Sequence, residues 1–278
     1  MIRVKIIADS IVDDKRVTTF ELEYPRYIHS ELLTHRVFSR NCASSRAIPL
    51  DKMIELTIDN PVIPIWTRNQ KGMSGVRITD VNEKAKATSA WLETRNKVIE
   101  GVRKLQELGI HKQNANRLLE PFQHIKTILT GVEFDNLFKL RIADCVQPEF
   151  YDLAVAMKHA IEESEPHKLK DYEVHAPYSE KGYLKKSEIY EILKCVALIA
   201  QVSYRKENDT EETIKRIVNN LIGHEQIHAS PFEHICWYNI LNTKGNLQPF
   251  QQLRHTIEEC NVKTYEELIN TLQLEAEQ

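Results

Sequence analysis

Glycine is scarce in this sequence, since only eight of its 278 residues are glycine. No two of the eight are separated by a single residue, so the dinucleotide-binding pattern Gly-x-Gly-x-x-Gly cannot be written from them, and neither can a P-loop. This excludes the nucleotide-binding sites that depend on a glycine cradle. If the chain binds a nucleotide, polar side chains must replace glycine amides around the phosphate.

Long apolar runs and an excess of one charge are also absent. No stretch approaches the roughly eighteen apolar residues of a membrane-spanning helix, and 37 basic against 40 acidic residues create no overall field for nucleic acid. Lys5 and Asp9 interrupt the first apolar segment, which indicates a strand better than a signal peptide. Five scattered cysteines without a Cys-x-x-Cys pair favour a reducing compartment. We therefore expect a cytoplasmic protein without membrane or nucleic-acid partners.

The hydrophobic pattern predicts a helix-rich α+β fold with a small, mostly antiparallel sheet, in one domain over residues 1–278. Residues 164–186 are the best internal linker. The expected strands are 4–8, 18–24 and 232–241. The expected helices are 25–39, 80–108, 187–203, 211–222, two short ones in 247–276, and three in about 111–163, broken near Pro121 and Pro148. Residues 40–49 and 59–80 are expected to be loops.

The segment 34–46 concentrates polar groups that suit phosphate. It contains three arginines, three serines, an asparagine and a histidine within thirteen residues. Arginine offers a planar fork of donors, and serine and asparagine add neutral ones. A solvated surface turn explains the composition equally well, so this pattern alone leaves both interpretations open.

A second segment, 223–234, contains the zinc-hydrolase pattern His224-Glu225-x-x-His228, with His234 at the spacing of a third ligand. The longer zinc signature requires glycine where Pro231 stands, and it requires a methionine downstream, whereas the last methionine is Met157. The shorter two-histidine signature stays open.

Three further arginines, Arg117, Arg141 and Arg254, follow or flank apolar residues on expected helices. Each side chain either turns inward toward an anion or extends along the surface to a carboxylate. Because an isolated arginine on a helix usually extends along the surface to a carboxylate, the pattern by itself favours surface positions for these three side chains.

Taken together, these segments resemble the flavin-dependent thymidylate synthases, the ThyX family. The family's signature is Arg-His-Arg, seven residues and Ser, and it is matched by His35, Arg36, Ser39, Asn41, Ser44 and Arg46, with Thr34 in place of the first arginine and Ala47 in place of a usual tyrosine. The family's His-x-x-Pro-Phe-Glu-His motif is matched by 228–234. Shorter similarities lie at 117–121, 136–141 and 200–204.

The order of the motifs differs from that of the family. There the Pro-Phe-Glu-His segment precedes the Arg-His-Arg loop, whereas here it follows, as a circular permutation would produce. The segment 251–255, Gln-Gln-Leu-Arg-His, is similar to the start of the family's signature helix. We expect Gln251 and Arg254 to supply the donors missing at Glu31 and Thr34. Residues 59–110 carry little specific signal and are expected to be a family-variable insertion.

The resemblance implies methylation of dUMP to dTMP, with methylenetetrahydrofolate as carbon donor, NADPH or NADH as reductant and FAD as cofactor, in a homotetramer with shared active sites and no metal. The residues it implies for dUMP are Ser44, Arg46, Arg117, Arg141, Gln251 and Arg254, of which Ser44 and Arg141 are the catalytic candidates. Those it implies for FAD are His35, Arg36, Asn41, Asn136, Ser203, His228 and Glu233. The alternatives are the zinc hydrolase and a catalytically inactive homologue that binds flavin or nucleotide.

Overall fold

The computed structural model describes residues 2–72, 75–203 and 210–277. Its first sheet has the strand order β3-β6-β2-β1-β7, where the strands are β1 (Arg3–Val12), β2 (Lys15–Pro25), β3 (Ser39–Cys42), β6 (His124–Gly131) and β7 (His167–Lys168). All neighbours are antiparallel except β1 and β7. The alternation of Phe20, Leu22 and Tyr24 with Glu21 and Glu23 gives β2 one apolar face and one polar face.

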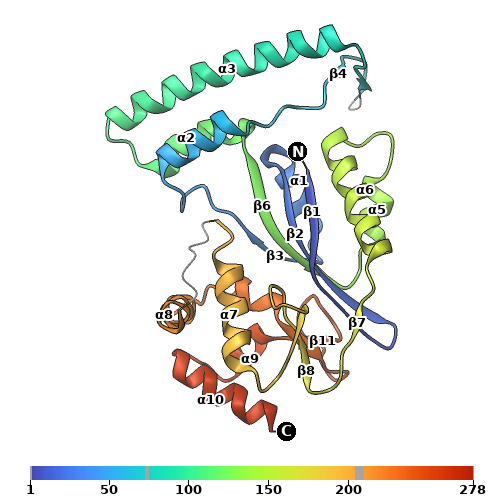
Figure 1. The fold of residues 1–278 in the computed structure, drawn as a ribbon, viewed down its shortest axis with the longest axis vertical. Helices are drawn as coiled ribbons and strands as arrows, with labels where there is room; N and C mark the ends of the chain where they lie inside the picture. The colour runs from blue at the N-terminus through green and yellow to red at the C-terminus, as the bar shows by residue number, and fades with distance from the viewer. Residues whose placement is uncertain (1, 73–74, 204–209, 278) are drawn as a thin grey trace.

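Short helices cover the apolar face of this sheet. They are the 3₁₀ turn η1 (Arg26–Ile28) and helix α1 (His29–Leu33), which follow β2, and α5 (Asp135–Arg141) and α6 (Pro148–Glu163), which follow β6 (Figure 1). Phe20, Leu22 and Tyr24 pack there against Phe134 and Phe150, all nearly inaccessible to solvent. This cluster is the core of the first layer.

A second sheet lies beside the first, with the order β11-β10-β8-β9. Its strands are β8 (Glu173–His175), β9 (Tyr183–Lys185), β10 (Cys236–Tyr238) and β11 (Phe250–Gln252). The helices α7 (Ile189–Ala200), α8 (Glu211–Ile222), α9 (Leu253–Glu259) and α10 (Tyr265–Ala276), with the 3₁₀ turn η3 (Ser230–His234), form the largest apolar cluster with it. The carboxyl-terminal part of the chain therefore has its own core (Figure 1).

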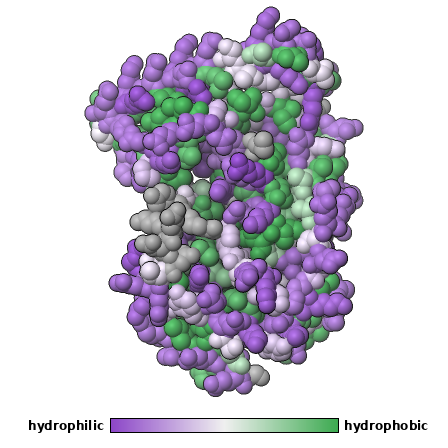
Figure 2. Space-filling view, viewed as in Figure 1, coloured by the Kyte–Doolittle hydropathy of each residue, from purple (hydrophilic) through white to green (hydrophobic). Residues whose placement is uncertain are grey.

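A third, smaller cluster lies at the end of the molecule where the long helix α3 (Val81–Glu107) crosses α2 (Leu50–Asp59) (Figure 1). Helix α4 (Lys112–Ala115), the 3₁₀ turn η2 (Asn116–Phe122) and the hairpin β4 (Thr67–Arg68) and β5 (Val76–Arg77) complete this region. Asp80 caps α3 by accepting from the Glu83 amide, and Gly109 closes the helix end with φ +72°. Figure 2 shows apolar side chains among polar ones at this end of the molecule. Leu56 and Ile58 of α2 are both exposed. Among the described residues, no helix combines the length and the apolar character needed to span a bilayer.

The predicted fold class is confirmed, as are the first two strands and the helix from 80 to 108. The largest error concerns β6, which was expected to be helical. All but two of its residues are buried, because Ile125 and Leu129 pack into the cluster of the first layer and Ile128 packs into the cluster of the carboxyl-terminal part. A strand buried on both faces lacks the polar alternation that identifies a strand in sequence.

Smaller errors arise because the strands concerned are short. The expected loop 40–49 begins with β3, the expected loop 59–80 holds β4 and β5, and the linker 164–186 contains β7, β8 and β9. The strand expected at 232–241 is η3 followed by the shorter β10, and β11 precedes the helices expected after 247. Each of these strands is two to four residues long and is defined by its partner strand rather than by its own pattern.

A chain of buried hydrogen bonds joins the two sheets. His175 of β8 bonds Ser10 of β1 through Nδ1 (2.9 Å) and Thr19 of β2 through Nε2 (2.7 Å). Thr19 bonds Thr130 of β6, and Thr130 bonds His234 Nδ1 of η3, each at 2.7 Å. Burial lowers the pKa of both histidines to about 3, and for His234 the neighbouring His175 adds to the effect. Both imidazoles are therefore neutral in the folded protein.

These histidines predict a stability that falls in acid. Below the ordinary pKa of 6.5, the unfolded chain takes up protons that the folded chain does not, so the free energy of unfolding decreases from pH 6.5 down to about 3. Above pH 6.5 these two histidines cause no further change in the free energy of unfolding. Each histidine adds a slope of at most about 1.4 kcal/mol per pH unit.

Urea unfolding at pH 7, 6 and 5 measures this slope. The variant His175→Gln is expected to reduce the slope of the unfolding free energy with pH by the contribution of one titrating group, at most about 1.4 kcal/mol per pH unit. His159→Gln, whose native side chain is 67% exposed beside Glu163, is the control and is expected to leave it nearly unchanged. A His175→Gln slope equal to that of the wild type would contradict the assignment.

Candidate functional site

Strand β3 divides the polar loop 34–46 into two parts. Residues 34–38 follow α1, and 43–46 follow the other end of β3. Because a strand rises about 3.3 Å per residue, the four residues of β3 separate the two parts by roughly 13 Å. The candidate residues therefore form two groups, one at each end of this strand.

The first group surrounds Arg141, the last residue of α5. Its Nε lies 2.9 Å from His35 Nε2, its Nη1 lies 2.9 Å from Glu31 Oε2, and its Nη2 lies 3.1 Å from Thr34 Oγ1. The guanidinium also lies over the ring of Phe150, 4.5 Å from its centre. Residues more than a hundred positions apart in the chain thus meet at one point.

Burial lowers the pKa of His35, and the positive charge of Arg141 lowers it further. The neutral imidazole accepts the Arg141 Nε–H at Nε2, which leaves Nδ1 as the protonated nitrogen. This explains how a histidine lies against a guanidinium without repulsion.

The second group links the end of β3 to α7 and η3. Asn41 donates through Nδ2 to the carbonyl of Ile199 (2.6 Å) and accepts from Ser230 Oγ (2.9 Å). The Ser44 amide donates to Ser203 Oγ at 2.7 Å, and Ser44 Oγ accepts from the Arg46 amide at 3.3 Å. The loop is therefore anchored to the carboxyl-terminal part of the chain by side chains on both sides.

The His-x-x-Pro-Phe-Glu-His segment contributes Glu233, which forms an ion pair with Arg254 of α9. Arg254 also bonds Glu258 through Nε at 2.8 Å. His228 is exposed, and its ring lies 5.8 Å from that of His224. His228 and Glu233, both expected to bind FAD, therefore lie in the same segment but have different surroundings. His228 is exposed, whereas Glu233 is paired with an arginine.

The remaining expected residues are placed as follows. Arg36, Arg46 and Asn136 are exposed, and Arg117, with 63% of its side chain exposed, pairs with Glu120 at 3.4 Å. Gln251 bonds Asn239 and Thr256 rather than the loop. Because neighbouring residues of a strand face opposite sides, Gln252 is the one that faces the loop. It donates to Ser39 Oγ (2.9 Å) and to the carbonyl of Glu233 (2.8 Å).

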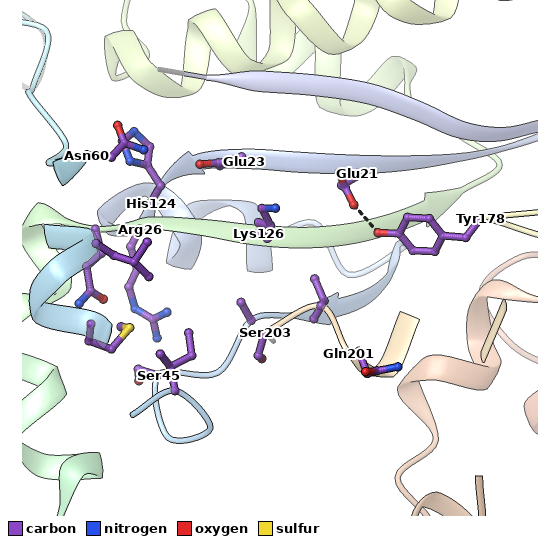
Figure 3. A pocket seen from close by; sticks show the side chains of 16 residues that line it. Glu21, Glu23, Arg26, Ser45, Asn60, His124, Lys126, Tyr178, Gln201 and Ser203 are labelled. Atoms are coloured by element: carbon purple, nitrogen blue, oxygen red, sulfur yellow. Dashed lines mark hydrogen bonds between the residues drawn. The ribbon is translucent and has the colours of Figure 1, made fainter. Parts of the chain in front are cut away.

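A pocket of about 350 Å³ lies next to the second group (Figure 3). The polar face of β2 and β6 forms one wall with Glu21, Glu23 and Lys126, and the loop after β3 forms another. In Figure 3, Arg26 reaches toward Ser45, and Tyr178 donates its hydroxyl to Glu21. The full lining is Glu21, Glu23, Arg26, Ala43, Ser45, Ile48, Met53, Leu56, Asn60, Gln123, His124, Lys126, Tyr178, Gln201, Val202 and Ser203.

Of the residues that line the pocket, only Ser203 was expected from the sequence to belong to a site, and those missed include Arg26, Gln123 and Lys126. Arg26 follows a proline at the end of an expected strand, and Gln123 and Lys126 lie in a segment expected to be helical. Only the pairing of β2 with β6 brings their side chains to one wall.

The zinc pattern does not form the geometry that zinc hydrolysis requires. Helix α8 ends at Ile222, so His224 and His228 do not share the face of a helix. His234 is fully buried and bonds Thr130. Within the described ranges, no group of three or more histidine, cysteine or acidic side chains is placed to hold a metal ion.

Comparison with known proteins gives one family. The model of the family described as "Thymidylate synthase complementing protein" matches residues 14–167. No curated protein matches the sequence. A solved structure, that of the UMP/dUMP methylase PolB from Streptomyces cacaoi bound with 5-Br UMP, is similar at 14% identity with a TM-score of 0.47. The similarity covers 59% of this chain and 89% of that one.

The contact between Arg141 and His35 makes a prediction about titration. Replacing Arg141 with glutamine removes a nearby positive charge, so the pKa of His35 is expected to rise while staying below 6.5, because burial still disfavours the imidazolium. Arg117→Gln is the control, since that arginine pairs with Glu120 on η2. Titration of the His35 ring signals by NMR measures both, and an unchanged pKa in Arg141→Gln would contradict the contact.

Proposed function

This chain belongs to the thymidylate synthase complementing protein family, whose model matches more than half of its length, and we propose that it methylates dUMP to dTMP. In this proposal methylenetetrahydrofolate gives the carbon, NADPH or NADH gives the electrons, and FAD is the cofactor. The family match includes the loop 34–46 and both arginine segments, at 117 and 141.

One observation carries the proposal further than the family match. Arg141 belongs to one segment of the family resemblance and Thr34 and His35 to another, and Arg141 contacts both residues in the fold. The contact supports the assignment of Arg141 to dUMP and of His35 to FAD.

The donor set fits anionic nucleotides. Arg36, Arg46 and Arg117 are exposed and accessible to phosphate, which glycine amides cannot bind here because the loop 34–46 contains no glycine. Arg141 and Arg254 are held by Glu31 and Glu233, so a phosphate would exchange with a carboxylate at an arginine that is already oriented. Bound FAD would supply hydride transfer, for which amino-acid side chains have no equivalent.

For the FAD contacts we propose His35, Arg36, Asn41, Asn136, Ser203, His228 and Glu233. Ser203 and Asn41 are already engaged with the loop and with η3, so they would bind FAD while holding the loop in place. For dUMP we propose Ser44, Arg46, Arg117, Arg141, Gln251 and Arg254. In the structure Gln251 accepts a hydrogen bond from Asn239, and this bond must break before Gln251 can bind dUMP.

Ser44 is assigned a positioning role. Its hydroxyl accepts from the Arg46 amide, and its own amide is held by Ser203, which sets the shape of the loop next to the pocket. A nucleophilic serine needs a base within hydrogen-bond distance, whereas the partners of Ser44 are the Arg46 amide and the Ser203 hydroxyl. Electrostatic activation of the uracil by clustered arginines is the simpler role for the protein.

The direct test measures cofactor, substrate and turnover in turn. Purified protein incubated with FAD and desalted is expected to keep flavin absorption bands that shift on addition of dUMP, and then to form dTMP. Ser44→Ala is expected to retain part of the turnover, because it removes a positioning contact only. Flavin binding without turnover would favour the inactive homologue, and a colourless protein indifferent to dUMP would contradict the proposal.

The separation of the two groups by β3 supports active sites shared between subunits, as in a homotetramer. In such an assembly, Arg141 of one subunit and Arg46 of another would complete one site. Arg141→Ala and Arg46→Ala are each expected to be inactive alone. When the two are unfolded together and refolded as a mixture, random pairing across a two-fold interface is expected to restore about a quarter of the wild-type activity.

The mixture needs a matched control. Arg141→Ala mixed with Arg141→Ala,Arg46→Ala leaves no complete site and is expected to stay inactive. No recovery in the first mixture would show that both residues act within one chain or at separate sites.

A further inference from the structure

Gln123 has a buried side-chain amide that no described residue satisfies. The residue is 4% exposed and lines the pocket next to the loop 43–48. Both backbone polar groups of Gln123 are hydrogen-bonded. Its carbonyl accepts from the Arg26 amide at 2.8 Å, and its amide donates to the Glu120 carbonyl at 3.2 Å. Within the described part of the chain, neither Nε2 nor Oε1 of the side chain has a hydrogen-bond partner.

Such an amide is unfavourable in a folded protein, because burial removes the water that satisfied both atoms in the unfolded chain. Gln252 shows how a buried side-chain amide is usually accommodated, with hydrogen bonds to its neighbours. It is 1% exposed, and its Nε2 donates to Ser39 and to Glu233. Gln123 therefore points to a partner that comes from outside the chain.

The chemistry of the pocket indicates what this partner is. A carboxamide presents one donor and one acceptor side by side in a plane, which matches the adjacent N–H and C=O of a cyclic imide or lactam. Ile48, Met53 and Leu56 supply apolar contact for a flat ring. Lys126 lines the same pocket and suits an anionic substituent on that ring, as does Arg26, whose Nη2 lies 3.2 Å from Glu120 Oε1.

We propose that Gln123 binds the N–H/C=O edge of a planar heterocycle that carries an anionic group. A pocket of about 350 Å³ suits one nucleotide, or the fused ring system of a larger ligand whose remainder extends outside the pocket. The choice of candidates rests on the proposed function. The uracil of dUMP, the pterin of methylenetetrahydrofolate and the isoalloxazine of FAD all present this edge.

The first experiment concerns the ligand-free protein and does not depend on the proposed function. Gln123→Leu removes two unsatisfied polar atoms and keeps apolar volume, so its urea midpoint is expected to rise above that of the wild type. The matched control is Gln252→Leu, which breaks two hydrogen bonds and is expected to lower the midpoint. A fall in Gln123→Leu as large as that in Gln252→Leu would overturn the inference, because Gln123 would then be satisfied within the folded chain.

The second experiment identifies the ring. Calorimetric titrations with dUMP, FAD and methylenetetrahydrofolate, each added alone, compare the wild type with Gln123→Leu and Gln123→Glu. One of the three is expected to bind both variants at least tenfold more weakly, and the other two to bind unchanged. If that one is dUMP, methylation of its N3 should weaken binding to the wild type and leave binding to Gln123→Leu unaffected.

The outcomes separate the two proposals. Equal affinity of all three ligands for wild type and variants would overturn the role of Gln123 and leave the function standing. Ligand binding that depends on Gln123 without dUMP turnover would overturn the function and leave the role of Gln123 standing. A wild-type protein that binds none of the three would overturn both.

Discussion

The buried hydrogen bonds between β2, β6, β8 and η3 determine how the two parts of the chain lie against each other. Thr130 and His234 connect β6 to η3, and Thr19 and His175 connect β2 to β8. Inside a protein, an unpaired polar group of this kind costs about 1–3 kcal/mol. The two sheets can therefore meet only in the arrangement that satisfies these groups, and that arrangement places η3 beside β3.

Once η3 is in place, the loop around β3 has a defined shape. Asn41 bonds Ser230, Ser44 bonds Ser203, and Gln252 bonds Ser39, so several contacts from the carboxyl-terminal part of the chain hold the loop. On the opposite side, Arg141 holds its first residues. The loop is preorganised by protein contacts, which reduces the cost of ordering it when a ligand binds.

The arginines of the site differ in how they are held. Arg141 and Arg254 have carboxylate partners within the chain, whereas Arg36 and Arg46 are exposed. Paired arginines are already oriented, and exposed ones attract anions without first losing a partner. The proposed nucleotide site, which has no glycine amides in the loop 34–46, would use both kinds, because side chains must supply orientation as well as charge.

The sequence by itself determined the family motifs, the fold class and the long helix from 80 to 108, because these depend on local residue type and spacing. It also gave the arginines at 117, 141 and 254 as candidates for a site. It did not identify β6, whose burial on both faces removes the polar alternation of a strand. It also selected Gln251, whereas the strand turns Gln252 toward the loop. The position of Gln123 in a pocket wall, the contact of Arg141 with His35 and the division of the site by β3 were decided by tertiary structure alone, because each joins segments that pair only after both sheets have formed.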